Sequence, residues 1–416
     1  GDCSVESNCL SVVPKETPFG RKRQIDQNSC NKDYSCLNGF CPSFVTVEGD
    51  ILSRQGSTAA SAEYEALVES LPSPEIPAVD AGYDLLVTGV GGTGVITVGA
   101  LITMAAHLEG KGASELDFMG FSQKFGPVLS YLRLAPEPAD INQVRIEPAH
   151  ADALIGGDLV VSSSSKASIT YQHDKTRALV NTAEIMTGDF IRHRDANLQS
   201  ADRVAAIAHA VGNENLTTID ANALAASLMG DTIYANVLLL GSAWQLGLVP
   251  VSLKALLRAI ELNGIKIEAN IKAFNWGRIA VVKPEALSNP PGNAESEVTA
   301  TLDGMLALRR NFLVDYQDEA LAERFESLVD RTRAVEAGLS DDTELTEAVA
   351  RSYFRLLSYK DEYEVARLHS RAELLDAVRH DFGNKARLRF HLAPPILNSG
   401  VDARGRPLKK EFGAWI

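Results

Sequence analysis

The sequence predicts an α/β fold with a mostly parallel sheet, a cysteine segment before it and a mainly helical domain after it. Three observations carry this prediction. All five cysteines lie in the first 41 of 416 residues, short apolar runs then alternate with segments of helical period, and charged amphipathic segments follow. We expect the parts to divide into a cysteine segment at residues 1–50, a linker at 51–82, the α/β domain at 83–284 and the helical domain at 285–416.

The chain is acidic, with a formal net charge of −14 and a pI near 5.1. Nucleic acid is therefore not expected as a partner, because phosphate binding needs a basic face. No uncharged apolar run reaches about 18 residues, so we expect no membrane span. The sequence opens at Gly1-Asp2-Cys3 without Met or an apolar leader, so we expect a cytoplasmic protein and a chain cut from a longer polypeptide.

The cysteines are spaced Cys3-x5-Cys9-x20-Cys30-x5-Cys36-x4-Cys41. An odd number does not fit a closed set of disulfides, and so short a segment buries too little apolar surface to fold without a metal. Thiolates ligate iron–sulfur clusters, and a proline after the last cysteine is typical of the common bacterial cluster-binding run. We predict an iron–sulfur site with all five as candidate ligands. A zinc site and idle thiols stay open as alternatives, although the missing C-x2-C pair disfavours zinc.

A glycine-rich turn follows the first apolar run of the α/β domain. Residues 84–90 are predicted to form a buried strand and residues 95–108 a helix, so the turn opens a strand–helix unit. Its pattern satisfies G-x-G-x-x-G, which lets backbone N–H groups and a helix N-terminus face an anion. Asp117 stands where a ribose-binding acid is expected. The alternative is a turn that packs without a ligand. The candidate cofactor-binding glycines are Gly89, Gly91, Gly92 and Gly94.

The rest of the chain is assigned from its periodicity. The further predicted strands are residues 128–134, 159–163, 178–181 and 217–220. The further predicted helices are residues 201–211, 235–247, 319–329 and 345–359. Residues 391–395 are predicted to form a loop, and His391 is given no role.

Polar side chains also precede and enter the strand at residues 128–134. Gln123, Lys124 and Arg133 stand among apolar residues, and the two cations suit a carboxylate or phosphate ligand. The alternative is a solvated loop with an arginine on an edge strand. No G-x-S-x-G, H-E-x-x-H or Walker A motif occurs, so no catalytic residue is assigned.

Several segments together resemble the fused bacterial indolepyruvate ferredoxin oxidoreductases, within the 2-oxoacid:ferredoxin oxidoreductase family. The most specific are the cysteine segment and Phe121-Ser-Gln-Lys-Phe-Gly126, and the others extend the similarity over nearly all the chain. The segments that carry the resemblance are residues 3–9, 21–27, 29–44, 89–94, 121–126, 130–133, 236–241, 270–278, 359–368 and 391–398.

The resemblance implies a ferredoxin-like segment, a Rossmann-like gamma domain and a C-terminal accessory domain. It implies oxidative decarboxylation of aryl pyruvates to acyl-CoA, with electrons passing through [4Fe–4S] clusters to ferredoxin. Thiamine diphosphate and Mg²⁺ would bind in upstream domains of the same polypeptide, because the Gly-Asp-Gly…Asn-Asn motif is absent here. Coenzyme A is the implied co-substrate, and a homo-oligomer is expected.

Two other functions stay open at this point. One is an NAD-binding oxidoreductase that uses Gly89, Gly91, Gly94 and Asp117. The other is a non-catalytic assembly module. The preferred 2-oxoacid and the number of clusters are left undecided.

Overall fold

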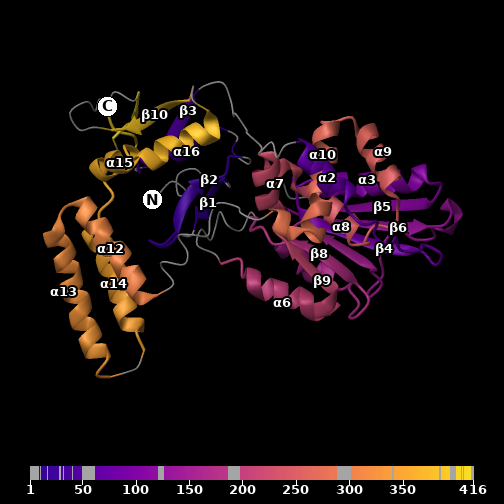
Figure 1. Cartoon of the computed structure of the whole chain (residues 1–416), viewed down its shortest axis with the longest axis horizontal. Helices are drawn as coiled ribbons and strands as arrows, with labels where there is room; N and C mark the ends of the chain where they lie inside the picture. The colour runs from indigo at the N-terminus through magenta and orange to yellow at the C-terminus, as the bar shows by residue number, and fades with distance from the viewer. Residues whose placement is uncertain are drawn as a thin grey trace. The chain divides into compact units, whose positions relative to one another are not determined.

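The computed structural model divides the chain into two compact units (Figure 1). The first joins Gly1–Arg54 to Pro291–Ile416, and the second is Gln55–Pro290. The structure describes residues 9–413 except for residues 10, 16, 28–29, 31, 40, 49–60, 120–125, 186–196, 288–300, 340–341, 384–385, 394–399, 404 and 406.

The second unit is built on a six-stranded sheet with strand order β5-β6-β4-β7-β8-β9. Strands β4, β7, β8 and β9 pair in parallel, whereas β6 runs antiparallel to both β4 and β5. The predicted mostly parallel α/β fold is therefore confirmed. The strands are β4 Tyr83–Val90, β5 Gly112–Met119, β6 Pro127–Ala135, β7 Ala153–Gly156, β8 Arg177–Asn181 and β9 Leu216–Ile219.

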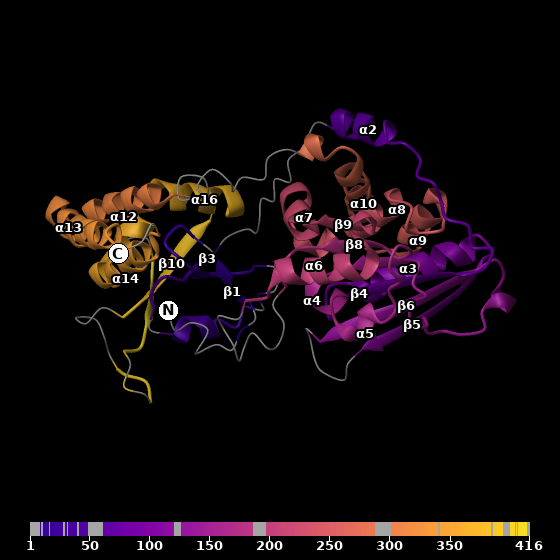
Figure 2. The same ribbon diagram turned by 90° about the horizontal axis from the view of Figure 1, so that it is seen from below.

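Helices cover both faces of this sheet (Figure 2). One apolar core lies between the sheet and α3, α8, α9 and α10, and a second lies between the sheet and α4, α5 and α6. Strand β4 contributes to both, with Leu85 and Val87 in the first core and Leu86 and Val90 in the second. The helices are α2 Ser61–Glu69, α3 Val95–Leu108, α4 Leu159–Ser162, α5 Ser165–Ser168, α6 Ser200–Val211, α7 Ala221–Met229, α8 Ala235–Gln245, α9 Leu253–Asn263 and α10 Ile267–Val282.

The predicted strand at residues 159–163 is wrong. The strand is β7, which ends at Gly156, and residues Leu159–Ser162 form α4 instead. The Asp158 side chain accepts a hydrogen bond from the Val161 N–H and so begins a helix. A run of three apolar residues fits a buried strand and a short helix equally well, and the cap decides between them.

The predicted linker at residues 51–82 contains a helix. The described part of this segment begins with α2, which spans Ser61–Glu69. The Tyr64 ring lies 5.0 Å from the Trp276 ring, and Leu67 and Leu71 pack on the first core. Apolar residues three and four positions apart therefore bind this segment to the α/β domain before the proline-rich part begins.

Helices α8 and α10 approach each other closely through two glycines. A Cβ added to Gly277 would meet the backbone carbonyl of Leu238, and one added to Gly241 would meet that of Phe274. The contact therefore has no room for a methyl group on either helix.

We expect Gly277→Ala to lower the free energy of unfolding of this unit by about 1–3 kcal/mol, because the added methyl forces the two helices apart. Urea unfolding followed by the fluorescence of the buried Trp244 and Trp276 measures the change. Gly338→Ala is the matched control, since its Cβ would meet nothing closer than 3.5 Å. Equal midpoints for the two variants would contradict the packing argument.

The first unit combines small sheets with helices. Strands β1 and β2 form an antiparallel pair, and β3 joins β10 and β11 in a three-stranded sheet. Helices α12, α13 and α14 pack around Phe325 and Phe354. The strands are β1 Val12–Lys15, β2 Lys22–Ile25, β3 Val45–Glu48, β10 Arg387–Leu392 and β11 Lys410–Phe412. The helices are α12 Leu302–Tyr316, α13 Glu319–Glu336, α14 Glu344–Leu357, α15 Glu362–His369 and α16 Ala372–Phe382.

His391 lies in strand β10, so the predicted loop there is wrong at this residue. Its ring Nε2 is 3.1 Å from the Thr46 Oγ1 on β3. The partner strand lies more than 300 residues earlier in the chain, which is why local patterns did not predict the strand. Among the helices in the described ranges, none combines the length and apolar composition that crossing a lipid bilayer requires.

Candidate functional site

The glycine turn lies where the buried strand β4 meets helix α3. Gly92 and Gly94 have φ of +95° and +86°, which only glycine adopts without strain. The Thr93 hydroxyl donates to the Val90 carbonyl at 2.7 Å, and the Gly91 N–H donates to the Gly126 carbonyl at 2.7 Å. Among the residues that the structure describes, no side chain caps the N-terminus of α3. The turn therefore leaves the positive end of a 14-residue helix open to an anion.

Packing accounts for the two outer glycines of the motif. A Cβ on Gly89 would lie 2.5 Å from the Val95 side chain, and one on Gly94 would collide with Asn236 of α8. Both glycines are thus needed for the strand and the helices to approach, whether or not a ligand binds. The reading of the turn as a packing device is supported as strongly as the reading of it as a binding loop.

The sequence reasoning missed a buried carboxyl group beside this turn. Asp158 is 1% exposed and follows β7, so it lies at the same carboxyl edge of the sheet as the turn. Its Oδ1 accepts from the Val161 N–H at 2.8 Å, whereas its Oδ2 has no hydrogen-bond partner among the described residues. Burial raises the pKa of Asp158, against the opposing effect of nearby backbone N–H groups. The Gly156-Gly157-Asp158 sequence after an apolar run is the signal that would have located it.

Asn181 at the end of β8 completes this edge. Its Nδ2 donates to the Gly157 carbonyl at 3.1 Å and to the Asn222 Oδ1 at 2.9 Å, and its Oδ1 accepts from the Ala221 N–H at 3.0 Å. These bonds fix the strand end to α7. Ligands of open α/β sheets bind at the carboxyl ends of the strands, so the turn, Asp158 and Asn181 mark the candidate site.

Arg133 does not belong to this edge. In the β4–β6 ladder it lies opposite Asp84, whereas Pro127 lies opposite Val90 at the turn. Six residues of strand, about 20 Å, separate the two ends. The Arg133 Nη1 is 3.4 Å from the Asp84 Oδ2. Arg133 is thus an ion-pair partner at the far end of the sheet, and the structure does not bring it together with the glycine turn.

Gln123 and Lys124 lie outside the described residues. The described chain resumes at Gly126, whose carbonyl accepts a hydrogen bond from Gly91. Only Gly126, the first described residue after them, is thus shown to bond to the glycine turn, and a role for either side chain stays a prediction.

Asp117 does not occupy the position of a ribose-binding acid. Such an acid ends the parallel strand next to the first one, but here β6 separates β4 from β5. Asp117 pairs with Ser130, which pairs with Val87, so it lies about two strand spacings away and short of the turn. No observation on this sheet favours the NAD-binding alternative.

Four of the five predicted cysteine ligands fall within the described residues, and Cys3 does not. Cys9, Cys30, Cys36 and Cys41 are all half-buried. Burial raises the pKa of the Cys36 thiol to about 11, with the charges of Cys9 and Cys30 adding to it. Cys9 and Cys30 thus each lie within electrostatic reach of Cys36.

Cys41 differs from the other three in its surroundings. Burial opposes its ionisation, but hydrogen bonds with Ser43 and the positive charge of Lys360 bring the pKa of Cys41 below its ordinary value. Its Sγ is 3.2 Å from the Ser43 Oγ. Within the part of the chain that the structure describes, no three His, Cys, Asp or Glu side chains converge on a point where one metal ion would sit.

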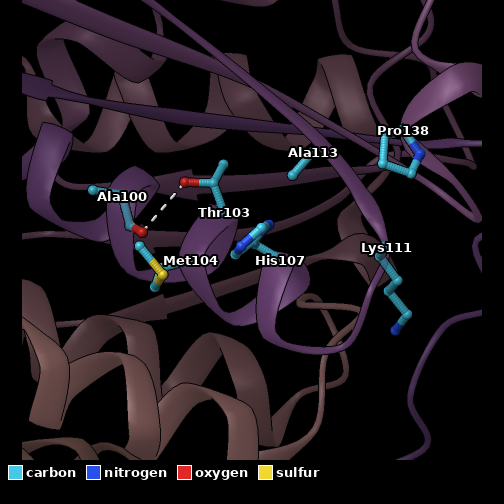
Figure 3. Close-up of a pocket in the computed structure, with 7 residues that line it drawn as sticks. All are labelled: Ala100, Thr103, Met104, His107, Lys111, Ala113 and Pro138. Atoms are coloured by element: carbon cyan, nitrogen blue, oxygen red, sulfur yellow. Dashed lines mark hydrogen bonds between the residues drawn. The ribbon is translucent and has the colours of Figure 1, made fainter.

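A shallow pocket of about 390 Å³ opens along the outer side of α3 (Figure 3). Its few polar groups are largely engaged. The Lys111 Nζ donates to the Pro250 carbonyl at 2.8 Å and pairs with Glu109, and the Thr103 hydroxyl donates to the Ala100 carbonyl at 3.2 Å. The pocket therefore lacks the converging polar groups of a catalytic site. Its lining residues are Ala100, Thr103, Met104, His107, Lys111, Ala113 and Pro138.

The α/β domain matches the model of a known family. Residues 84–280 match the pyruvate ferredoxin/flavodoxin oxidoreductase family. We refer to residues 84–280 as the oxidoreductase domain. Residues 302–416 match a different family, which is of unknown function (DUF6537).

Two curated relatives match this chain over 202 residues, which is 47% of this chain and 94% of each relative. They are the indolepyruvate oxidoreductase subunits IorB of Pyrococcus horikoshii, 25% identical, and of Thermococcus kodakarensis, 23% identical. Among solved structures, a keto/oxoacid ferredoxin oxidoreductase gamma subunit from Geobacter sulfurreducens is 21% identical with a TM-score of 0.34, and the match covers 48% of this chain and 98% of that one.

The buried carboxyl group of the oxidoreductase domain gives a pH-dependent prediction. Because burial raises the folded-state pKa of Asp158 above the unfolded value of about 3.9, its contribution to stability is present below that pH and is lost as pH rises through the folded-state pKa. Asp158→Asn keeps an oxygen that accepts a hydrogen bond from the Val161 N–H. Because the amide does not ionise, the variant does not lose stability at this position as pH rises. We therefore expect the variant to gain stability relative to the wild type as pH rises from about 4 to 7.

Urea unfolding at several pH values measures this difference. Asp158→Ala is the control, because it removes the helix cap as well and should cost about 1 kcal/mol at low pH, where the carboxyl is neutral. A constant difference between Asp158→Asn and the wild type across this pH range would show that the Asp158 pKa is not raised.

Proposed function

We propose that this chain is part of a thiamine-diphosphate-dependent 2-oxoacid:ferredoxin oxidoreductase of the indolepyruvate type. The match of residues 84–280 to the oxidoreductase family carries the proposal, and the names of the two curated relatives support the choice of substrate class. In this reaction an aryl pyruvate loses CO₂, its acyl group passes to coenzyme A, and two electrons leave for ferredoxin.

The cysteine segment would hold an iron–sulfur cluster. Its donors are thiolates, the ligands that such clusters require, and Cys9 and Cys30 each lie within electrostatic reach of Cys36. The ligands of a cluster bond different iron atoms, so they need not converge on one point as they would around a single ion. We propose Cys3, Cys9, Cys30, Cys36 and Cys41 as the set from which the ligands of a [4Fe–4S] cluster come. The cluster would supply one-electron transfer.

The carboxyl edge of the oxidoreductase domain would bind an anionic part of a substrate. The open N-terminus of α3 and the glycine turn present backbone N–H groups, which suits a phosphate of coenzyme A. A carboxylate at Asp158 would oppose an anion, but burial raises the pKa of Asp158, so the neutral carboxyl group, which can donate a hydrogen bond, persists to a higher pH than it would in water. Gly92, Gly94 and Lys124 are the residues we propose for this contact, because the Gly91 N–H already donates to the Gly126 carbonyl.

Thiamine diphosphate would act as the electron sink for decarboxylation. The sequence lacks the Gly-Asp-Gly…Asn-Asn motif for its diphosphate and Mg²⁺, so we propose that domains outside this chain hold them. Ferredoxin is the proposed electron acceptor, a homo-oligomer the proposed assembly and the cytoplasm the proposed location.

We expect anaerobically prepared protein to contain iron and acid-labile sulfide with the visible and EPR spectra of a [4Fe–4S] cluster. Cys41→Ala should lose most of this signal, because a lost thiolate leaves an iron atom without a ligand. Ser227→Ala on the exposed part of α7 is the control and should keep it. Zinc, or no metal, in the wild type would contradict the cluster.

The reaction itself is tested with the complete enzyme, supplied with thiamine diphosphate, Mg²⁺ and coenzyme A. We expect reduction of a viologen dye that depends on indolepyruvate and is weaker with a branched aliphatic 2-oxoacid. Iron-loaded protein that reduces no dye with any 2-oxoacid would contradict the proposed activity.

A further inference from the structure

The cysteine segment inserts an aromatic side chain into the helices of the C-terminal domain. The Phe19 ring lies 5.1 Å from the Phe312 ring of α12 and 5.5 Å from the Phe354 ring of α14, stacked on the latter. Phe19 is packed against the same apolar cluster that holds α12, α13 and α14 together. A residue of the first twenty thus completes a core whose other members lie beyond residue 300.

A buried arginine holds the backbone beside this ring. Arg309 of α12 is 2% exposed, and its Nη2 donates to the Pro18 carbonyl at 3.2 Å. Its guanidinium carbon lies 5.5 Å from the Phe354 ring and 5.9 Å from the Phe19 ring. Burial lowers the pKa of Arg309 to about 10, because it removes water from the guanidinium. The Pro18 carbonyl and the two rings offset this desolvation cost.

A lysine near the end of the chain holds the loop that connects two cysteines. The Lys409 Nζ donates to the Leu37 carbonyl at 3.0 Å and to the Cys41 carbonyl at 2.7 Å. Leu37 belongs to the 3₁₀ turn η1, Ser35–Asn38, which also contains Cys36. One ammonium group therefore fixes the backbone beside Cys36 and at Cys41.

The strand after Cys41 belongs to the sheet of the C-terminal domain. Strand β3 pairs antiparallel with β10, with Val45 opposite Phe390 and Glu48 opposite Arg387. The Arg389 Nε lies 2.9 Å from the Glu48 carboxylate across this ladder. The sheet without β3 would have only two strands, which are marginally stable alone.

We propose that residues 302–416, which match a family of unknown function, serve as the holder of the cysteine segment: they fold together with residues 9–48 and fix the backbone around Cys36 and Cys41. Residues 9–48 are too few to bury a core of their own, and the C-terminal domain supplies the missing aromatic, cationic and strand partners. The holder function concerns protein contacts, so it does not depend on which metal the thiols bind or on the reaction proposed above.

Hydrogen–deuterium exchange on the full chain tests the role of Lys409. We expect Lys409→Met to speed amide exchange in peptides that cover residues 33–48 by about tenfold, because two charge-assisted hydrogen bonds are lost. Lys410→Met changes the exposed neighbour and is the matched control. Equal exchange in the two variants would overturn the assignment of Lys409.

A variant in the cysteine segment tests whether the C-terminal helices depend on that segment for their fold or only contact it. Phe19→Ala should speed exchange in α12 and α14 by more than about tenfold, although the substitution lies far away in the sequence. Tyr34→Ala removes a 49% exposed aromatic from the same segment and should leave these helices unchanged. Faster exchange confined to the neighbourhood of residue 19 would show that the domain folds without the segment and would overturn the proposal.

These outcomes are distinct from those of the functional proposal. Metal analysis and dye reduction decide the cluster and the reaction, whereas exchange rates in the metal-free protein decide the holder function. If the variants speed exchange as expected but the wild type contains no iron, the holder function is supported and the cluster is rejected. If the wild type contains iron but the variants do not speed exchange as expected, the cluster is supported and the holder function is rejected.

Discussion

Strand β4 is buried over its whole length, and the geometry of the oxidoreductase domain depends on that burial. It has β6 on one side and β7 on the other, and apolar cores on both faces. Its polar residues must therefore find partners inside the protein: Asp84 lies beside Arg133, and the Thr88 hydroxyl is 2.8 Å from that of Ser162. The glycine turn begins where this strand ends, so a fully buried strand places the candidate site.

The elements predicted correctly are those in which apolar residues follow one clear period, that of a strand or that of a helix. The run from the buried strand through the glycine turn to α3 was predicted nearly as observed, because strand, turn and helix each have their own residue types. The strand prediction at residues 159–163 was wrong because three apolar residues are too few to show a period, and the decisive signal was the cap at Asp158. The loop prediction at His391 was wrong for another reason. His391 belongs to a strand that pairs with β3, and the local sequence does not indicate so distant a partner.

The candidate site was predicted only in part, because a motif specifies a turn but not the order of strands around it. Asp117 follows the glycines at a suitable distance along the chain, yet the antiparallel β6 stands between its strand and β4. Lys124 and Arg133 are close in sequence, but a strand extends about 3.3 Å per residue and moves Arg133 to the far end of the sheet. Asp158 was missed because its raised pKa results from burial, and burial depends on the fold and not on the local sequence.

The two units are not consecutive along the chain: the oxidoreductase unit, Gln55–Pro290, is inserted within the other. A ribosome that adds about 5–20 residues per second needs on the order of 10–50 seconds to pass from residue 54 to residue 291. During that interval the cysteines have left the ribosome before Arg309 and Lys409 exist to receive their segment. The order of synthesis therefore leaves the segment that carries the thiols without these two partners for most of the time that the chain takes to be made.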